Sequence, residues 1–207
     1  MTNEIIVILG RKGCGKTTLL RKYISGKKRV ILWDPIGQFA DGVIISDPVS
    51  LLRFLQINCE KSYRIIYNPE PEARVPADLV EDKKETDYIK RHFAALCEIV
   101  RSLYDVYLAV DEVDLVTKAW ECPNSFRSLI AHGRHSLISI VATTRRQTET
   151  ARLLTSQADI LISFEQHEPS DIKYLATFFG KKANELKTLK KYSYLEWKNG
   201  QTCCRMP

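Results

Sequence analysis

The sequence predicts an α/β fold in which a mostly parallel central sheet is flanked by helices. Short apolar runs rich in β-branched residues alternate with stretches whose apolar residues recur at helical spacing, an order that builds parallel sheets. A glycine-rich turn joins the first apolar run to the first helical stretch. Near the C-terminus, two strand-like segments flank Asn199-Gly200, a dipeptide typical of tight hairpins. We expect the 207 residues to form one domain, with the hairpin of about 192–205 added at an edge of the sheet.

The predicted parallel strands are continuous apolar runs, which is typical of strands covered on both faces. They end at glycine or at polar residues, where turns begin. In chain order, strands are expected at 4–9, 29–33, 42–46, 63–67, 106–110, 137–143 and 159–164.

The predicted helices carry apolar residues three or four positions apart. The first stops before Gly26, a residue suited to a helix end, and the last begins near Pro169, which fits a first helical turn. Residues 68–84 are polar and contain several prolines, so a surface loop is expected there. Helices are expected at 17–25, 50–57, 86–103, 125–132, 148–154 and 169–179.

The composition is that of a globular protein. Hydrophobic residues make up 44% and charged residues 27% of the chain, which excludes disorder, collagen and coiled coil as the dominant state. No apolar run approaches the ~20 residues that span a bilayer. Glu4 leads into only five apolar residues with no basic segment before them, so we expect no secretory signal and a protein that works in a cytosol.

Positive charge is concentrated in two parts of the chain. The net charge is +6, from 31 Lys and Arg against 25 Asp and Glu. Residues 11–29 contain eight cations and no anion, and residues 181–207 contain seven cations against two glutamates. Such runs either form a solvated face or bind a polyanion.

Neither the six cysteines nor the four histidines predict a metal site. No cysteine pair has the C-x-x-C spacing of zinc sites, and free thiols are the default outside secreted proteins, with the cytosol of a hyperthermophile as the exception. His132 and His135 could share a helix face, but surface or capping positions are the simpler interpretation.

One segment matches the phosphate-binding pattern G-x-x-x-x-G-K-[ST] in full. The glycines let the backbone wrap a phosphate with its N–H groups turned inward, and the helix that follows adds the positive end of its dipole. The lysine reaches the β- and γ-phosphates of ATP, and the threonine hydroxyl is a Mg²⁺ ligand. Because a buried strand precedes the turn and a helix follows it, we expect a P-loop made of Gly10, Arg11, Lys12, Gly13, Cys14, Gly15, Lys16 and Thr17.

Two acids follow the predicted strand 106–110. Asp111, at the strand end, can hold Mg²⁺ together with Thr17, and Glu112 can activate a water for attack on the γ-phosphate. The alternative is a pair of acids that merely solvates a turn. An adjacent glutamate favours an ATPase over a Ras-like GTPase, and the chain has no N-K-x-D guanine motif. Asp114, the third acid, is expected to be structural.

Residues 132–135, HGRH, and 137–147, LISIVATTRRQ, resemble the HerA/FtsK superfamily of DNA-pumping ATPases. In that family a GR-containing helix end leads into a strand that closes on A-T-Q-R-P. Residues 154–175 resemble the strand and helix that follow, so the likeness spans residues 5 to about 175. It implies a P-loop NTPase of the RecA-like ASCE type, with ATP and Mg²⁺ as cofactors.

The chain departs from the family pattern at two positions. Thr144 stands where the family has a glutamine that senses the γ-phosphate, and Arg146 replaces a proline. Thr144 is therefore the expected sensor, although its side chain has a shorter reach, and Gln147 is an alternative. A core of 207 residues without added domains is similar to the genome-packaging ATPases of tailless icosahedral viruses with an internal membrane. That resemblance implies a motor that moves double-stranded DNA, in the cytoplasm of an infected host or at the packaging vertex of the virion.

The resemblance also implies a homo-oligomeric ring, a pentamer or hexamer, in which an arginine of the neighbouring subunit completes each site. Arg134 is the first candidate for this arginine and Arg145 the second. The alternative for Arg134 is a cation that stabilises the end of its helix. No cation of the same subunit is expected opposite Lys16.

The loops that follow the acid pair are expected to face the DNA. Lys118 and Arg127 could make phosphate contacts there, and Trp120 is expected to anchor the loop by packing rather than to act as a wedge. A capsid vertex or viral membrane protein is a further candidate partner.

Other functions remain open from the sequence. One is a HerA-like cellular DNA translocase or helicase, and another is a phage-assembly or secretion ATPase, although such proteins usually carry a membrane-spanning segment. A nucleotide-switched binding module that moves nothing is a third, against which Glu112 argues. A small-molecule kinase is a fourth, and it would not need the elements of residues 132–147.

Overall fold

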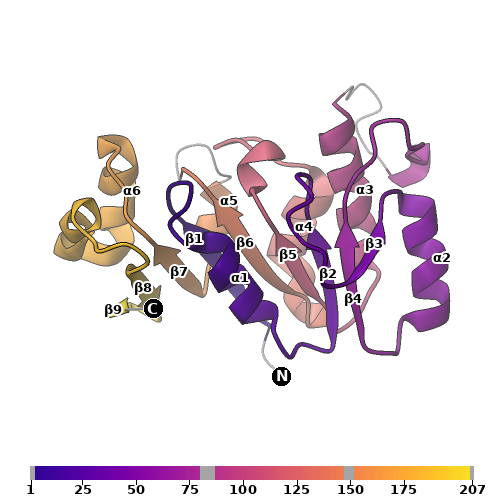
Figure 1. The fold of residues 1–207 in the computed structure, drawn as a ribbon, viewed down its shortest axis with the longest axis horizontal. Coiled ribbons are helices and arrows are strands. Elements are labelled where there is room, and N and C mark those ends of the chain that lie inside the picture. The colour runs from indigo at the N-terminus through magenta and orange to yellow at the C-terminus, as the bar shows by residue number, and fades with distance from the viewer. Residues whose placement is uncertain (1–2, 80–86, 147–151, 206–207) are drawn as a thin grey trace.

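The computed structural model describes residues 3–79, 87–146 and 152–205. Over these residues the strands form one nine-stranded sheet in the order β3-β4-β2-β5-β6-β1-β7-β8-β9, parallel from β3 to β7 and antiparallel at β8 and β9. This confirms the predicted α/β P-loop fold with a C-terminal hairpin (Figure 1). The strands are β1 (Ile5–Leu9), β2 (Arg29–Trp33), β3 (Val43–Ile45), β4 (Tyr63–Tyr67), β5 (Tyr107–Val110), β6 (Ser139–Thr144), β7 (Ile160–Ser163), β8 (Tyr194–Lys198) and β9 (Gln201–Arg205).

The helices lie close to their predicted positions, and the differences are at their ends. The second begins two residues early, since Asp47 caps it by accepting the Ser50 N–H at 2.8 Å. The segment 147–151, which holds Gln147 and most of one predicted helix, lies outside the described residues. The α-helices are α1 (Lys16–Ile24), α2 (Pro48–Asn58), α3 (Tyr88–Arg101), α4 (Asn124–His132), α5 (Arg152–Ser156) and α6 (Pro169–Phe179), and the 3₁₀ turns are η1 (Ala77–Leu79), η2 (Val113–Leu115), η3 (Gly133–Ser136) and η5 (Gly180–Lys187).

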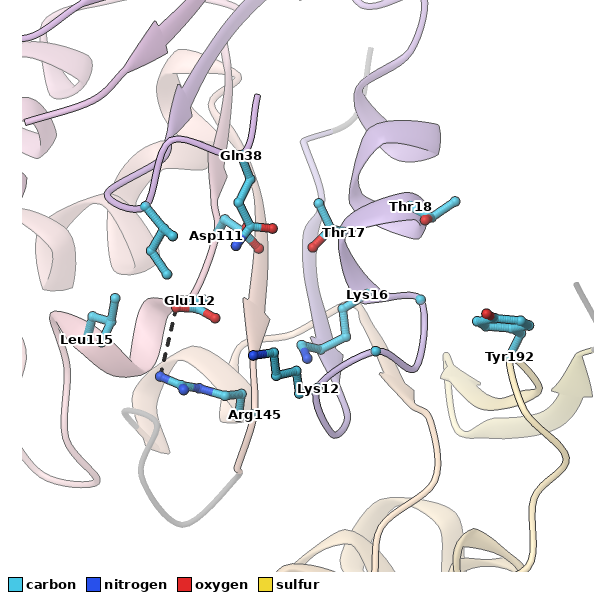
Figure 2. Close-up of a pocket in the computed structure, with 13 residues that line it drawn as sticks. Lys12, Lys16, Thr17, Thr18, Gln38, Asp111, Glu112, Leu115, Arg145 and Tyr192 are labelled. Atoms are coloured by element: carbon cyan, nitrogen blue, oxygen red, sulfur yellow. Dashed lines mark ion pairs between the residues drawn. The ribbon is translucent and has the colours of Figure 1, made fainter. Parts of the chain in front are cut away.

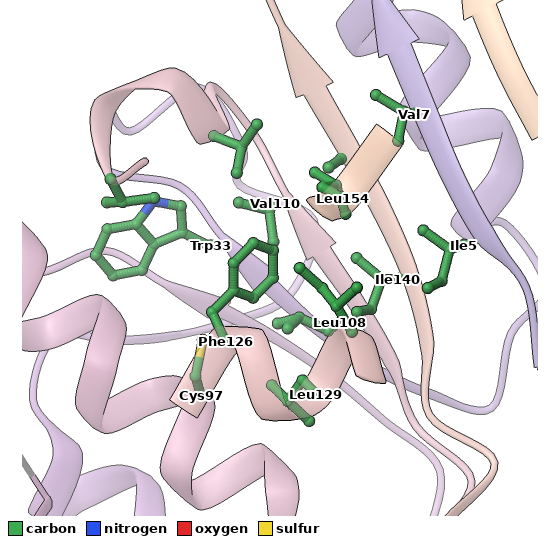
Figure 3. Packing of buried hydrophobic residues seen from close by; sticks show 14 of the residues in the cluster. Ile5, Val7, Trp33, Cys97, Leu108, Val110, Phe126, Leu129, Ile140 and Leu154 are labelled. Atoms are coloured by element: carbon green, nitrogen blue, oxygen red, sulfur yellow. The ribbon is translucent and has the colours of Figure 1, made fainter. Parts of the chain in front are cut away.

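The sheet is buried on both faces, as continuous apolar strands require. Along β1, Ile5, Val7 and Leu9 face a core built with α2 to α6, part of which Figure 3 shows, whereas Ile6 and Ile8 face a second core built with α1. Within the first core, the Trp33 ring packs edge-on against Phe93, with 5.1 Å between ring centroids. Phe93 in turn packs edge-on against Phe126. Packing on both faces holds the strand ends, and so the first residues after each strand, in defined positions.

The strand order brings the P-loop and the acid pair to one edge of the sheet. β6 lies between β1 and β5, with Val7 beside Ala142 and Val141 beside Ala109. The three strands are parallel, so their carboxyl ends meet at the same edge. The loop after β1, the acids after β5 and the end of β6 therefore surround one region.

The C-terminal hairpin begins at that same edge. Asn199 and Gly200 have φ values of 50° and 78°, the left-handed pair that a two-residue hairpin turn requires. β8 runs antiparallel to β7, with Leu195 beside Ser163. The residues just before β8 therefore lie beyond the carboxyl end of β7, next to the P-loop. Among the described residues, none of the helices has the length and apolar character needed to cross a bilayer.

Candidate functional site

The loop between β1 and α1 has the backbone that phosphate binding requires. Gly15, just before the helix, has φ 106°, a conformation that other residues resist. At Gly10 a Cβ would lie 2.6 Å from Cys14 Sγ and 2.7 Å from Phe164 Cβ, so only glycine fits there. Lys16 is 9% exposed, and its Nζ donates to the carbonyl oxygens of Gly10 at 2.8 Å and Arg11 at 3.0 Å. The loop thus encloses its own lysine at the N-terminus of α1.

The remaining loop residues lie at the surface of this turn. Arg11 and Lys12 are exposed, and Arg11 is 3.8 Å from the Glu165 carboxylate. Cys14 is half-buried, and burial raises the pKa of its thiol. A neutral thiol under the loop adds no negative charge where phosphate would bind.

The acid pair at the end of β5 is held by Thr143 of β6. Asp111 is 3% exposed, and its Oδ1 accepts the Thr143 hydroxyl at 2.6 Å. The same hydroxyl oxygen accepts the Glu112 N–H at 3.0 Å. Burial raises the pKa of Asp111, and the Thr143 hydrogen bond opposes that rise. One buried hydroxyl therefore fixes the positions of both acids.

Glu112 has a strained backbone that turns it away from the strand. Its φ is 52°, in the left-handed region, which costs a residue with a long side chain on the order of 1–3 kcal/mol. Such strain is concentrated at functional sites. Burial raises the pKa of Glu112, and the Arg145 guanidinium opposes the rise. A raised pKa makes the carboxylate a stronger base, closer in pKa to the pH at which the enzyme works.

Arg145 lies beside this glutamate in the same subunit. Its guanidinium is 3.8 Å from Glu112 Oε2 and 3.1 Å from Asp114 Oδ2. The expectation that no cation of the same subunit lies opposite Lys16 is wrong, because β6 runs two residues beyond the end of β5, to Thr144, and the next residue, Arg145, lies beside the acids. Asp114, which was expected to be structural, pairs with this arginine.

These groups line one pocket of about 660 Å³ (Figure 2). Thr17 and Asp111 lie on facing sides of it. Arg145, Glu112 and Leu115 lie at one end of the pocket, and Tyr192 and Thr18 lie at the other. The lining residues are Lys12, Gly13, Gly15, Lys16, Thr17, Thr18, Ile36, Gln38, Asp111, Glu112, Leu115, Arg145 and Tyr192.

Sequence reasoning missed three residues in or directly behind the wall of this pocket. The first is Thr143, whose neighbour Thr144 was the predicted sensor. The second is Asp34, fully buried after β2, whose carboxylate accepts the N–H groups of Gly37, Gln38 and Phe39 at 2.9–3.0 Å and shapes the wall of the pocket. In the sequence, Asp34 could have been recognised as an acid that directly follows the predicted strand 29–33. The third is Tyr192, for which the sequence holds no local signal.

Other predicted residues are not among those that line the pocket. Thr144 is fully buried, and its hydroxyl donates to the Arg146 carbonyl oxygen at 3.2 Å. Arg146 Nε is 3.6 Å from the buried Asp171 carboxylate of α6. Arg134 is exposed in η3, before the amino end of β6 and hence at the edge opposite the P-loop. Its predicted action on a neighbouring subunit stays a prediction.

The loop that carries Trp120 does not bury this residue. Lys118 and Glu121 exchange backbone hydrogen bonds of 2.7 and 3.1 Å, and Trp120 between them is 76% exposed. The Arg152 guanidinium lies 4.3 Å from the centre of the indole ring. The expectation of a packed anchor is therefore wrong. Arg127 is exposed nearby and, together with Trp120 and Arg152, lines a second pocket.

We expect Thr143→Val to lower ATP turnover more than ATP affinity, because valine keeps the shape but removes both hydrogen bonds that position the acids. Leaving the Asp111 carboxylate and the Glu112 N–H without this partner should also cost about 1–3 kcal/mol of unfolding free energy. Steady-state turnover, a nucleotide titration and denaturant unfolding measure the three effects.

Thr143→Ser is the control, since it retains the hydroxyl and should recover most of the turnover. Thr144→Val tests the neighbouring sensor candidate in the same assay. If Thr144→Val lowers turnover and Thr143→Val does not, the sensor is Thr144 and the positioning role of Thr143 is wrong.

Comparison with known proteins places this geometry in a family. The model of the AAA domain family matches residues 1–150. No curated protein sequence matches the chain. The genome packaging NTPase B204 from Sulfolobus turreted icosahedral virus 2, in complex with ATP-gammaS, has a TM-score of 0.73 at 19% identity and covers 99% of this chain and 97% of its own.

Two further solved structures share the fold. The DNA-packaging ATPase B204 from Sulfolobus turreted icosahedral virus has a TM-score of 0.70 at 20% identity, covering 100% of this chain and 99% of its own. VirB4 of Thermoanaerobacter pseudethanolicus has a TM-score of 0.62 at 15% identity and covers 99% of this chain and 89% of its own. With the P-loop, the acid pair at the end of β5 and the family match over residues 1–150, the chain belongs to the AAA-domain family of P-loop ATPases.

Proposed function

We propose that this protein is an ATP-hydrolysing motor that moves double-stranded DNA, and that it packages a viral genome into a preformed capsid. The observation that carries the ATPase part is the acid pair, Asp111 and Glu112, facing the P-loop lysine and threonine across one pocket. A binding module has no need of a strained, partly buried glutamate at that place. Each further step of the proposal rests on this site.

The P-loop would hold the triphosphate. Its inward N–H groups and the N-terminus of α1 favour the negative charge, and Lys16 can exchange its loop carbonyls for the β- and γ-phosphate oxygens. Thr17 and Asp111 together offer a hydroxyl and a buried carboxylate, the oxygen donors that suit Mg²⁺ beside phosphates. Bound there, Mg²⁺ would neutralise phosphate charge.

Glu112 would act as the base for hydrolysis. It accepts a proton from water as the water oxygen bonds to the γ-phosphorus, and the bond from that phosphorus to the bridging oxygen of ADP breaks. Asp111 and Thr143 keep the glutamate in place through the hydrogen bonds of the strand ends. The Arg145 guanidinium, on the same side of the pocket, can offset charge on the transferring group.

The DNA part of the proposal is supported by likeness and by charge. The B204 structures named above are packaging enzymes with this fold over nearly the whole chain. The chain carries a net charge of +6, which favours a polyanion. The proposed assembly is a ring of five or six subunits, with a capsid vertex or viral membrane protein as docking partner, in the cytoplasm of an infected host or at the vertex of the virion.

ATPase activity with and without double-stranded DNA, measured across protein concentration, tests the proposal. We expect DNA to stimulate turnover and the rate per subunit to rise as rings form. Turnover that does not change with DNA would favour the phage-assembly or secretion ATPase that the sequence left open. Nucleotide binding without turnover would favour the switched binding module.

We expect DNA binding to be blind to sequence and to fall steeply with salt, because contacts with phosphates carry the affinity. The slope of log affinity against log salt should be about −0.9 for each phosphate contacted. Titrating two duplexes of unrelated sequence over a range of salt measures both properties. Binding confined to one duplex, or insensitive to salt, contradicts the proposal for DNA.

A further inference from the structure

We propose that Tyr192 is the surface on which the base of the nucleotide stacks. The inference rests on the proposed ATP site and assigns the part of the substrate that the P-loop cannot reach. P-loop groups recognise phosphates, so the base needs a separate partner. Tyr192 is an aromatic side chain at the end of the pocket away from Glu112 and Arg145 (Figure 2).

The fold brings this tyrosine to the P-loop from far along the chain. β8 runs antiparallel to β7, which places its first residues beside the carboxyl end of β7, and Phe164 there touches Gly10. Tyr192 Cδ1 lies 3.4 Å from where a Cβ of Gly15 would be, in van der Waals contact with the loop. The ring therefore borders the same loop that is expected to hold the phosphates.

The direction of a bound nucleotide follows from the ends of the pocket. The γ-phosphate must lie near Glu112, which activates the water, and the β- and γ-phosphates near Lys16. The α-phosphate and ribose then continue past the first turn of α1, where Thr18 lines the pocket. Tyr192 lies on that side of α1, at the same end of the pocket as Thr18, where the base attached to that ribose would be.

The ring is open to a ligand and is held there by a strained backbone. Tyr192 is 45% exposed, with φ 71°, although tyrosine gains nothing from the left-handed region. The next residue, Ser193, is buried and donates its N–H to the Lys190 carbonyl oxygen at 2.9 Å, which closes the turn. Lys191 Nζ is 5.0 Å from the ring centre, and so long a side chain can move aside for a base. A strained, exposed aromatic residue beside a substrate pocket indicates a binding role.

Affinity for ATP and for inorganic tripolyphosphate separates stacking from support of the loop. We expect Tyr192→Asn to weaken ATP binding between about 5-fold and about 150-fold, the range for loss of one base–aromatic stack, and to leave tripolyphosphate binding unchanged. Asparagine is chosen because it tolerates a left-handed backbone, so the variant should fold. Tyr192→Phe retains the ring and should bind ATP as the wild type does. Tyr104→Asn, at an exposed tyrosine before the amino end of β5, is the matched control.

A second measurement does not depend on loss of affinity. In Tyr192→Trp, ATP should quench indole emission beyond the change seen in the wild type, and tripolyphosphate should not. Equal weakening of ATP and tripolyphosphate in Tyr192→Asn means that the tyrosine only supports the P-loop, and overturns the inference. Unchanged ATP affinity in Tyr192→Asn, or no quenching in Tyr192→Trp, also overturns it. A wild type that binds neither ligand would refute the proposed function itself.

Discussion

Lys16→Ala is expected to weaken ATP binding by about 100-fold or more, whereas Glu112→Gln is expected to bind ATP normally and lose about 10²- to 10⁴-fold in turnover. Lys16 is the buried cation of the loop, held between two carbonyl oxygens until phosphate replaces them. Glutamine keeps the shape of Glu112 but cannot accept the proton. A nucleotide titration and a phosphate-release assay on each variant measure the two effects separately.

Two surface substitutions serve as controls. Lys22→Ala removes an exposed cation from the last turn of α1, and Glu121→Gln removes an exposed carboxylate from the loop after η2. Both should match the wild type in binding and turnover. If Glu112→Gln hydrolyses ATP at nearly the wild-type rate, Glu112 is not the water activator, and the proposed chemistry must pass to another base.

The parts of the site that were predictable are those encoded by contiguous residues. The P-loop is a local pattern, because its glycines are required by the conformation and the close contacts of the turn itself. The acid pair is also local, since an apolar strand that ends in Asp111 and Glu112 must place them at the sheet edge. Alternating strands and helices were sufficient for the fold class. Such motifs can be recognised from the sequence because they do not depend on how the strands pair.

The parts that were missed depend on register between strands. Thr143 and Thr144 are adjacent in sequence, and only the pairing of Ala142 with Val110 decides which of them lies beside Asp111. Side chains alternate along a strand, so a choice that is wrong by one residue selects the opposite face. The same register brings Arg145 to the acids of its own subunit. The charge pattern of the sequence does not reveal this register, so it could not place Arg145 beside Glu112 and Asp114.

Tyr192 and Trp120 show two further limits. Tyr192 reaches the pocket because the hairpin folds back along β7, a contact between segments about 180 residues apart in the chain, since its partner is Gly15. Trp120 was expected to anchor its loop by packing rather than to act as a wedge. Its loop is closed by two backbone hydrogen bonds and needs no aromatic anchor. The composition of the chain cannot predict an exposed tryptophan whose ring faces the Arg152 guanidinium.

The last expected result concerns the ring. Arg134→Ala should lower turnover by about 10³- to 10⁵-fold with ATP affinity nearly unchanged, if this arginine completes the site of a neighbouring subunit. It is exposed in η3 at the sheet edge opposite its own P-loop, so it cannot reach its own nucleotide. His135→Ala, in the same turn and also exposed, is the control.

Mixing inactive variants distinguishes the two arginines. In rings that combine Arg134→Ala with Glu112→Gln subunits, some interfaces pair an intact arginine with an intact glutamate, so activity should return. Arg145 lies 3.8 Å from Glu112 of its own subunit. In mixtures of Arg145→Ala with Glu112→Gln every site lacks one of the two groups, so activity should stay lost. If Arg134→Ala shows no recovery in rings that demonstrably mix, the shared site is wrong. It is also wrong if a dilute monomer turns over ATP at the full rate. Recovery of activity in mixtures with Arg145→Ala would instead mean that Arg145 acts between subunits.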